Sequence, residues 1–322
     1  MNRRRWNQLL LKYPFLFALI LLAIAILVNA ILQPTFFTRE SLNNNMRVFL
    51  PLMILAVGQA VVMLGGGIDI SVGGIVSIVN TILATQVGLQ GSPQKMWLFV
   101  GLSLLAGLAA GTLNGFFVSV LRLQPIITTY ATSFLFFGIA LYILPNPGGG
   151  IPQAISGLYR NSTPLGIPLA IYVIVLILLG WYYLRHTRYG RYLYAVGGKA
   201  EAAYESGVPV VGIQFSTYII SGMMAAVAGI AMSMLTGSGN ADIGSAMTLN
   251  SVTAVVIGGT AFSGGVGGIA GPIVGAMTLQ MIMNIISFAN IDTWWQTFVN
   301  ALIIVIALAL PGLLNLFQGR KK

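Results

Sequence analysis

The hydrophobic positions of this chain form long uninterrupted runs, and few of them alternate with polar residues as they would in a half-exposed element. A helix that crosses a bilayer needs about 20 mostly apolar residues. Ten segments approach or exceed this length: 15–32, 47–65, 70–90, 96–121, 126–144, 166–184, 213–236, 249–262, 269–288 and 294–314. The pattern predicts an all-α polytopic membrane protein of about ten transmembrane helices, with residues 1–322 forming a single transmembrane domain.

Glycine-rich stretches interrupt this pattern and leave two alternatives open. The runs on either side of Gly65-Gly66-Gly67 form two helices or one long kinked helix, and the short run 249–262 spans the bilayer or re-enters it. Turns at membrane depth are tolerated only where protein or a cavity covers the backbone. We therefore expect glycine-rich helix breaks inside the protein. The first run lacks the small-residue ending of a cleaved signal peptide, so we expect it to be retained.

The charges between the runs predict the orientation of the chain. Cytoplasmic loops of membrane proteins carry an excess of Lys and Arg. With ten spans and a cytoplasmic N-terminus, twelve of the sixteen cations lie inside and four lie outside. The inside group is Arg3, Arg4, Arg5, Lys12, Arg122, Arg185, Arg188, Arg191, Lys199, Arg320, Lys321 and Lys322, and the outside group is Arg39, Arg47, Lys95 and Arg160. This bias predicts that both termini are cytoplasmic.

Two connecting segments are long for a compact membrane protein. The outer segment 145–168 is rich in Pro and Gly. The inner segment 185–212 carries charge and contains helix formers from Lys199 to Glu205, followed by Ser206-Gly207 and Pro209. This order predicts a short helix, which lies on the membrane surface or docks into a partner unless the segment is a solvated connector.

Composition supports a protein whose solvent is lipid. Of the 322 residues, 57% are hydrophobic and 7% are charged, where a soluble domain has about 25% charged residues. The formal charge of +10 would raise nucleic acid as a partner, but the cations lie in short juxtamembrane clusters without a stacking platform. We expect membrane lipid as a partner and no nucleic acid.

The inventory of reactive side chains argues against an enzyme. The chain has no cysteine, one histidine and six acidic residues, so thiolate metal sites and cysteine nucleophiles are excluded. His186 lies among arginines at the predicted inner membrane edge and is interpreted as interfacial. Trp97, Trp294 and Trp295 occupy the predicted outer ends of spans, where aromatic residues anchor helices. We expect no catalytic residue, metal or cofactor in this chain.

The two glycine-rich turns resemble each other. Residues 61–75 and 255–269 share seven identities at a constant offset of 194, and broken helices at corresponding positions of two halves indicate a transport pathway. The predicted spans give the two turns the same orientation. Neither turn carries the Lys of a phosphate-binding loop, so any nucleotide would bind to another chain.

The motifs around these turns resemble a known family. They are Gly66-Gly67-Ile68-Asp69-Ile70-Ser71-Val72-Gly73, residues 188–198, Ala202-Ala203-Tyr204-Glu205-Ser206-Gly207-Val208 and residues 254–260. Together they are similar to permease subunits of bacterial ABC importers for monosaccharides, the ribose, xylose, arabinose and galactoside group. The resemblance implies a multi-pass protein of the bacterial inner membrane, which forms the translocation pathway for a small neutral sugar.

The resemblance also implies partners. They are a second permease copy in a homodimer or heterodimer, two cytoplasmic ATPase subunits or one tandem ATPase that bind ATP and Mg, and a periplasmic sugar-binding protein. Segment 185–212 becomes a cytoplasmic coupling loop and 145–168 a periplasmic loop. The residues that match the family's coupling segment to the ATPase are Lys199, Glu201, Ala202, Ala203, Glu205, Ser206 and Gly207.

One departure from the family keeps the solute open. The family commonly has acidic residues ahead of the second glycine turn, where this chain has Thr248-Leu249-Asn250-Ser251. Members of this fold also move nucleosides and a furanosyl signalling molecule. An ATP-independent secondary transporter is a further alternative, although proton or sodium coupling usually needs buried acids along the pathway.

Asp69 is the only acidic residue at predicted membrane depth, between the glycine turn and the run 70–90, and such residues are functional candidates because burial of charge is costly. It follows the glycine turn where a helix restarts, so it either caps that helix or contacts the solute. The polar residues of the spans that are candidates for the pathway or for gating are Gln59, Asp69, Ser71, Asn80, Asn114, Thr128, Thr129, Thr132, Asn250, Ser251 and Thr253, with Gln280 and Asn284 as further members.

Overall fold

The computed structural model describes residues 15–292, 294–295, 298, 301–302 and 305, and it is all-helical within them. Nine apolar helices match the first nine predicted runs. They are α2 (Phe15–Leu32), α3 (Arg39–Leu64), α4 (Val72–Gln86), α5 (Pro93–Gly115), α6 (Pro125–Ile143), α8 (Leu169–His186), α11 (Val210–Thr236), α12 (Ser245–Ile257) and α13 (Ala270–Phe288). A π-helical turn, η1 (Phe116–Val120), extends α5.

Six of these helices are long and apolar enough to cross a membrane, namely α3, α5 with η1, α6, α8, α11 and α13. The apolar parts of α2, α4 and α12 are shorter. At 13 residues, α12 is about 20 Å long, less than the hydrocarbon thickness of a bilayer. The predicted run 294–314 and both termini lie largely or wholly outside the described residues, so the count of ten and the terminal orientation stay predictions.

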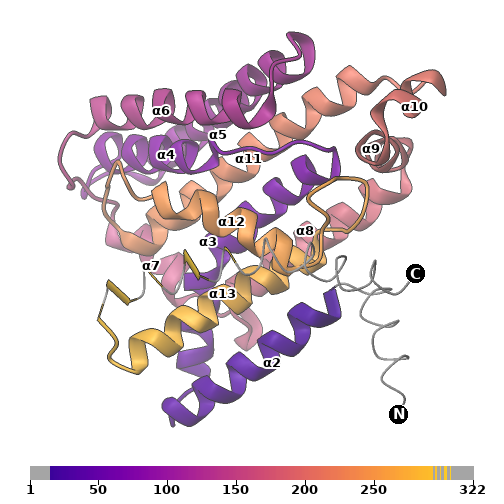
Figure 1. The fold of residues 1–322 in the computed structure, drawn as a ribbon. Coiled ribbons are helices and arrows are strands. Elements are labelled where there is room, and N and C mark those ends of the chain that lie inside the picture. Colours follow the sequence, from indigo (N-terminus) through magenta and orange to yellow (C-terminus); the bar gives the residue numbers. More distant parts are fainter. Residues whose placement is uncertain (1–14, 293, 296–297, 299–300, 303–304, 306–322) are drawn as a thin grey trace, which may run out of the picture.

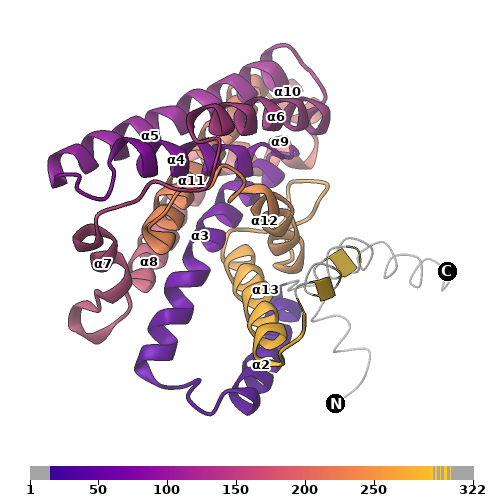
Figure 2. The same cartoon turned by 90° about the vertical axis from the view of Figure 1, so that its left-hand side faces the viewer.

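The arrangement is centred on α3 and α11. The span of α3 is 89% buried, and α3 crosses the centre of the molecule, with α4, α5 and α6 on one side and α2 and α13 on the other (Figures 1 and 2). Helix α11 packs against α5, α3 and α4. By contrast, only 6% of the span of α8 is buried. An apolar helix without a protein neighbour around most of its surface is suited to contact with lipid.

Small residues explain how closely α11 and α5 pack. Gly107 and Gly111 lie four residues apart on α5 and face Gly222 of α11. A Cβ atom on any of these three glycines would overlap the backbone of the opposite helix. Stripes of small residues are a common means of helix association in membranes, because they let backbones approach.

The loops that the sequence places on one side of the membrane do lie together. On the predicted outer side, Gly148 and Gly239 form a β-bridge and the Gly150 N–H donates to the Ala84 carbonyl at 2.9 Å. On the predicted inner side, the Gly265 N–H donates to the Leu64 carbonyl at 3.1 Å. The structure thus supports the relative sidedness of these loops. Which side is cytoplasmic is still predicted by charge alone.

The two long connecting segments are more ordered than the sequence suggested. Segment 145–168 contains α7 (Gln153–Asn161) and the 3₁₀ turn η2 (Pro164–Gly166). Segment 185–212 contains the predicted short helix as α10 (Ala200–Glu205) and also α9 (Arg188–Gly198), which was not predicted. Helix α9 ends in two glycines, which have low helix propensity, and it is stabilised by burying Leu193 and Val196.

Candidate functional site

The glycine turn after α3 is a Schellman motif. Gly66 has φ +82°, and its N–H donates to the Met63 carbonyl, while the Gly67 N–H donates to the Val62 carbonyl, both at 3.0 Å. This pair of bonds satisfies the last carbonyls of the helix and requires a left-handed residue, which is usually Gly. The break therefore ends α3 at Leu64, so the alternative of one long kinked helix is wrong.

The turn after α12 has the same geometry. Gly259 has φ +80°, its N–H donates to the Val256 carbonyl at 3.0 Å, and the Thr260 N–H donates to the Val255 carbonyl at 3.2 Å. Gly66 thus corresponds to Gly259, one residue less than the offset of 194. The repeat holds for the helix ends only. Residues 72–75 begin α4, whereas the identical residues 266–269 precede α13.

Both turns meet the end of α9. A Cβ atom on Gly197 would overlap the Leu64 carbonyl oxygen and approach the Gly265 nitrogen, so this contact requires glycine. The Tyr194 hydroxyl of α9 donates to the Gly267 carbonyl at 2.8 Å. Burial raises the pKa of Tyr194 against the opposing effect of Arg185, which keeps this hydroxyl protonated as a donor. The inner segment is therefore fastened to both helix breaks.

Asp69 lies directly after the first turn and is fully buried. Its Oδ1 accepts from the Ser71 backbone N–H at 3.0 Å and from the Ser71 hydroxyl at 2.6 Å. Its Oδ2 accepts from the Ser221 hydroxyl of α11 at 2.8 Å. The carboxyl group therefore forms an Asx turn with the N–H of Ser71, the residue directly before α4, and also joins the break to α11.

A chain of neutral groups extends from Asp69. The Asn114 Nδ2 donates to the Ser71 hydroxyl, and the Thr132 hydroxyl donates to the Asn114 Oδ1, both at 2.7 Å. The Ile70 N–H donates to the Thr129 hydroxyl at 3.0 Å. We call Asp69, Ser71, Asn114, Thr129, Thr132 and Ser221 the Asp69 network. It brings together five of the predicted pathway residues and connects the α3–α4 break with α5, α6 and α11.

Three polar contacts around the network could not be read from the sequence. Besides Ser221, they involve Tyr218, whose hydroxyl donates to the Ile68 carbonyl at 3.3 Å, and Thr248, whose hydroxyl accepts from the Gly73 N–H at 3.1 Å. The only available signal is that these side chains are polar within apolar runs. Ser, Thr and Tyr often occur there merely to bond a neighbouring helix.

Asn80 lies apart from the Asp69 network, towards the other end of α4. Its Nδ2 donates to the Ser233 hydroxyl at 3.0 Å and to the Ser238 carbonyl at 3.1 Å, and its Oδ1 accepts from the Asn240 N–H at 2.7 Å. All three of these partners belong to α11 or to the loop after it. The contacts indicate that Asn80 ties α4 to α11.

The remaining candidates are dispersed. On α12, the hydroxyls of Ser251 and Thr253 donate to carbonyls of their own helix at 2.7 and 2.9 Å, and Asn250 is half-buried. Thr128 is buried on α6. Asn284 of α13 donates to Asn45 of α3 at 3.1 Å. The structure therefore does not gather these residues into one site.

Gln59 is the unusual member of the set. It is fully buried on α3, and neither its Nε2 nor its Oε1 has a hydrogen-bond partner among the described residues. An unsatisfied buried polar group costs about 1–3 kcal/mol. Its burial therefore destabilises the conformation described here.

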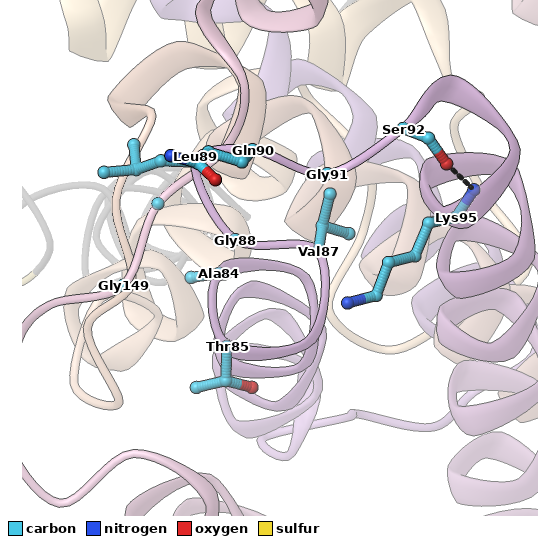
Figure 3. A pocket seen from close by; sticks show the side chains of 11 residues that line it. Ala84, Thr85, Val87, Gly88, Leu89, Gln90, Gly91, Ser92, Lys95 and Gly149 are labelled. Atoms are coloured by element: carbon cyan, nitrogen blue, oxygen red, sulfur yellow. Dashed lines mark hydrogen bonds between the residues drawn. The ribbon is translucent and has the colours of Figure 1, made fainter.

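A pocket of about 830 Å³ opens on the predicted outer side (Figure 3). It lies between the end of α4, the loop 88–92, the start of α5 and Gly149-Gly150. Figure 3 shows the exposed Lys95 side chain reaching from α5 into the space beside the end of α4, while its backbone N–H donates to the Ser92 hydroxyl at 3.3 Å. The pocket thus combines polar backbone with one cation.

The predicted coupling segment projects from the opposite side. Lys199, Glu201, Ala202, Glu205, Ser206 and Gly207 are exposed. Ala203 is buried and anchors α10 to the rest of the protein. Both acidic residues of α10 are thus accessible to a partner, whereas Ala203 is not.

Residues 41–308 match the model of the family described as "Branched-chain amino acid transport system / permease component". The chain belongs to this permease family. The match covers both glycine turns, the Asp69 network and α9–α10. It confirms the family resemblance of the motifs, and the permease is a multi-pass protein of the bacterial inner membrane.

Relatives of this permease are similar over most of their length. The ribose import permease protein RbsC of Escherichia coli K12 is 32% identical, over 90% of this chain and 91% of the relative. The fructose import permease protein FruG of Bifidobacterium longum is 32% identical, over 84% and 82%. The autoinducer 2 import system permease protein LsrC of Photorhabdus luminescens is 32% identical, over 82% and 79%. No solved structure gives a significant match.

Proposed function

We propose that this permease is the transmembrane subunit of an ATP-binding-cassette importer and forms the translocation pathway for a small neutral sugar. The observation that carries the proposal is the contact of α9 with both glycine turns, since it joins a projecting inner segment to both helix breaks, the first of which holds the Asp69 network. The import permeases similar to this chain act on ribose, fructose and autoinducer 2 by name. A neutral polyhydroxylated solute suits a pathway of amides and hydroxyls.

The partners follow from this role. A second permease copy would complete the membrane unit, and α10 would dock into a cytoplasmic ATPase that binds ATP and Mg. Hydrolysis would then take place in that partner, and this chain would need no cofactor of its own. A nucleoside or a furanosyl signal is the runner-up solute, because one of the relatives is named for autoinducer 2.

The outer pocket is the surface we assign to the binding protein. Its loops are fastened by backbone bonds from Gly150 to Ala84 at 2.9 Å and from Ile151 to Gly237 at 3.1 Å. Tyr159 of α7 donates to the Arg47 carbonyl at 2.7 Å, and burial raises the pKa of Tyr159, so it remains a donor at physiological pH. A surface held this firmly suits rigid-body docking.

The deciding experiment is reconstitution of the permease with its copurifying ATPase and binding protein in proteoliposomes. We expect uptake of a radiolabelled monosaccharide that requires ATP and stops when the ATPase loses its catalytic base. A panel of unlabelled ribose, fructose, nucleoside and leucine competitors identifies the solute class. Uptake that survives without the ATPase and collapses with an ionophore would instead establish a secondary transporter.

A further inference from the structure

The corner between α8 and α9 carries a concentrated positive charge. Arg185 and His186 end α8, and Arg188 and Arg191 lie in the first turns of α9. All four side chains are exposed. We call Arg185, Arg188 and Arg191 the arginine patch.

The described contacts of the arginine patch are with neutral groups. The Arg185 guanidinium lies over the Tyr194 ring, 5.7 Å from its centroid. The Arg191 Nη1 donates to the His186 carbonyl at 3.2 Å. A ring and a carbonyl orient a guanidinium but do not neutralise it. Both charges therefore remain available to an anion from outside.

The patch adjoins a surface that is suited to lipid. Leu179, Tyr182 and Tyr183 in the last turns of α8 are 61%, 67% and 76% exposed. The Tyr182 and His186 rings are 4.5 Å apart. Tyrosines at the end of an apolar helix mark the level of the lipid headgroups. Arg185 follows Tyr183 by two residues on α8, and Arg188 and Arg191 follow at the start of α9.

Helix α10 offers a different chemistry. Helix α10 carries the exposed acidic residues Glu201 and Glu205, whereas α9 carries the exposed cations Arg188 and Arg191. The opposite charges indicate that α9 and α10 have different partners. The cationic side continues the lipid-facing surface of α8, while the acidic side belongs to the segment proposed to meet the ATPase.

We propose that the arginine patch is a binding site for the phosphodiester headgroup of an anionic phospholipid. Guanidinium groups bind phosphate oxygens through paired N–H donors, and cation clusters next to a membrane helix bind anionic headgroups. Tyr194 contacts the Arg185 guanidinium through its ring and the Gly267 carbonyl through its hydroxyl. A headgroup bound to Arg185 would therefore be connected to the second glycine turn through Tyr194. The inference does not depend on which solute the permease moves.

The test is native mass spectrometry of the purified permease with phosphatidylglycerol or phosphatidylcholine added at equal concentration. We expect the parent protein to retain phosphatidylglycerol preferentially. The variant R185Q/R188Q/R191Q should reduce that retention by up to about a hundredfold, because each of the three cations at a membrane surface contributes about fivefold. The control R122Q/K199Q removes two cations of the same side that lie outside the arginine patch, and it should leave retention close to that of the parent protein.

Two further variants and one competitor complete the test. R185K/R188K/R191K keeps the charge without the paired donors and should lie between the parent and the glutamine variant. R188Q keeps two arginines of the patch, so the charge bias that sets the orientation of the chain in the membrane is largely retained. The orientation of each variant can be measured with single introduced cysteines, because the chain has no native cysteine. Unchanged phosphatidylglycerol retention in both R185Q/R188Q/R191Q and R188Q would overturn the proposal. So would retention abolished by inorganic phosphate, or lost ATPase binding with lipid retention intact.

Discussion

Asp69 illustrates how much a single side chain can connect in this fold. Its two carboxyl oxygens accept from Ser71 and Ser221, which belong to elements 150 residues apart in the chain. The amide of Asn in its place would keep one acceptor oxygen for the Ser71 N–H and hydroxyl. The amide nitrogen would donate to the Ser221 hydroxyl. The geometry therefore distinguishes loss of charge from loss of bonding.

We predict that Asp69→Asn folds normally and retains substantial uptake, since an amide oxygen also accepts from N–H and hydroxyl groups and Asn forms the same turn as Asp. Asp69→Leu should lower stability by several kcal/mol, because each buried donor left unpaired costs about 1–3 kcal/mol. Thermal unfolding in detergent and uptake in proteoliposomes measure the two effects. An Asp69→Asn complex that assembles well but transports nothing would assign the charge itself to the transport mechanism.

Gln59 provides the opposite case. We predict that Gln59→Leu raises the midpoint of thermal unfolding, because it replaces a buried amide that has no partner in the described part of the chain by an apolar group of similar size. Asn114→Leu is the matched control, since Asn114 is equally buried but bonded to Ser71 and Thr132. That variant should lower the midpoint. A fall in both variants would show that Gln59 has a stabilising partner.

The sequence identified many of these residues but not their contacts. A polar residue within or beside an apolar run stands out in the sequence, and this pattern indicates Asp69, Ser71, Asn114, Thr129 and Thr132. The bond from Asp69 to Ser221 depends on how α11 packs, and no local pattern encodes that. For the same reason the sequence could not separate Asn80, which ties two helices together, from members of the Asp69 network.

At the scale of helices, apolar run length predicted nine elements and their approximate ends. Gly66 and Gly207 follow helix ends as the sequence indicated, with φ of +82° and +80°. Helix α9 was missed because its glycines and aromatics give weak local signals, and its stability comes from tertiary burial of Leu193 and Val196. The π-helical turn η1 had no sequence signature.

Helix α10 gives the prediction at this scale. Glu205→Arg should reduce solute uptake severalfold while ATP hydrolysis continues, because it reverses an exposed charge on the segment proposed to dock into the ATPase. Crosslinks to the ATPase should form from a cysteine at Ala202, which is exposed, and not from one at Ala203, which is buried. Glu40→Arg reverses an exposed acid on α3, at the opposite side, and serves as the control. Coupled uptake by Glu205→Arg at the parental rate would contradict the assignment.

For the molecule as a whole, charge and run length placed the loops into two groups that the structure indeed brings together. Neither charge nor run length could indicate which helices pack against each other, such as the central position of α3 and α11. That order depends on backbone approach at Gly107, Gly111 and Gly222, and 39 glycines offer too many pairings to choose from.

The outer surface carries the prediction for the assembled importer. Replacing 147–152 with a Gly/Ser stretch should weaken the stimulation of ATPase activity by loaded binding protein and leave basal hydrolysis unchanged. The substitution removes the conformational restriction of Pro147 and Pro152, and with it the fixed shape of the pocket rim. A Gly/Ser replacement of 162–165, outside the pocket lining, is the control. Equal stimulation in all three proteins would argue that the loop is passive.

The position of Gly197 between the end of α3 and the loop after α12 has a mechanical consequence. Both ends point to the same side of the molecule, and α9 touches one through Leu64 and the other through Gly265 and Gly267. The contacts of Gly197 with Leu64 and Gly265 are made by backbone atoms, and the Tyr194 hydroxyl adds a hydrogen bond to the Gly267 carbonyl, so a displacement of α9 is transmitted to both turns. A displacement of α9 therefore moves both helix breaks together and in the same direction. The permease would then move as one rigid unit rather than as two halves that rotate in opposite directions.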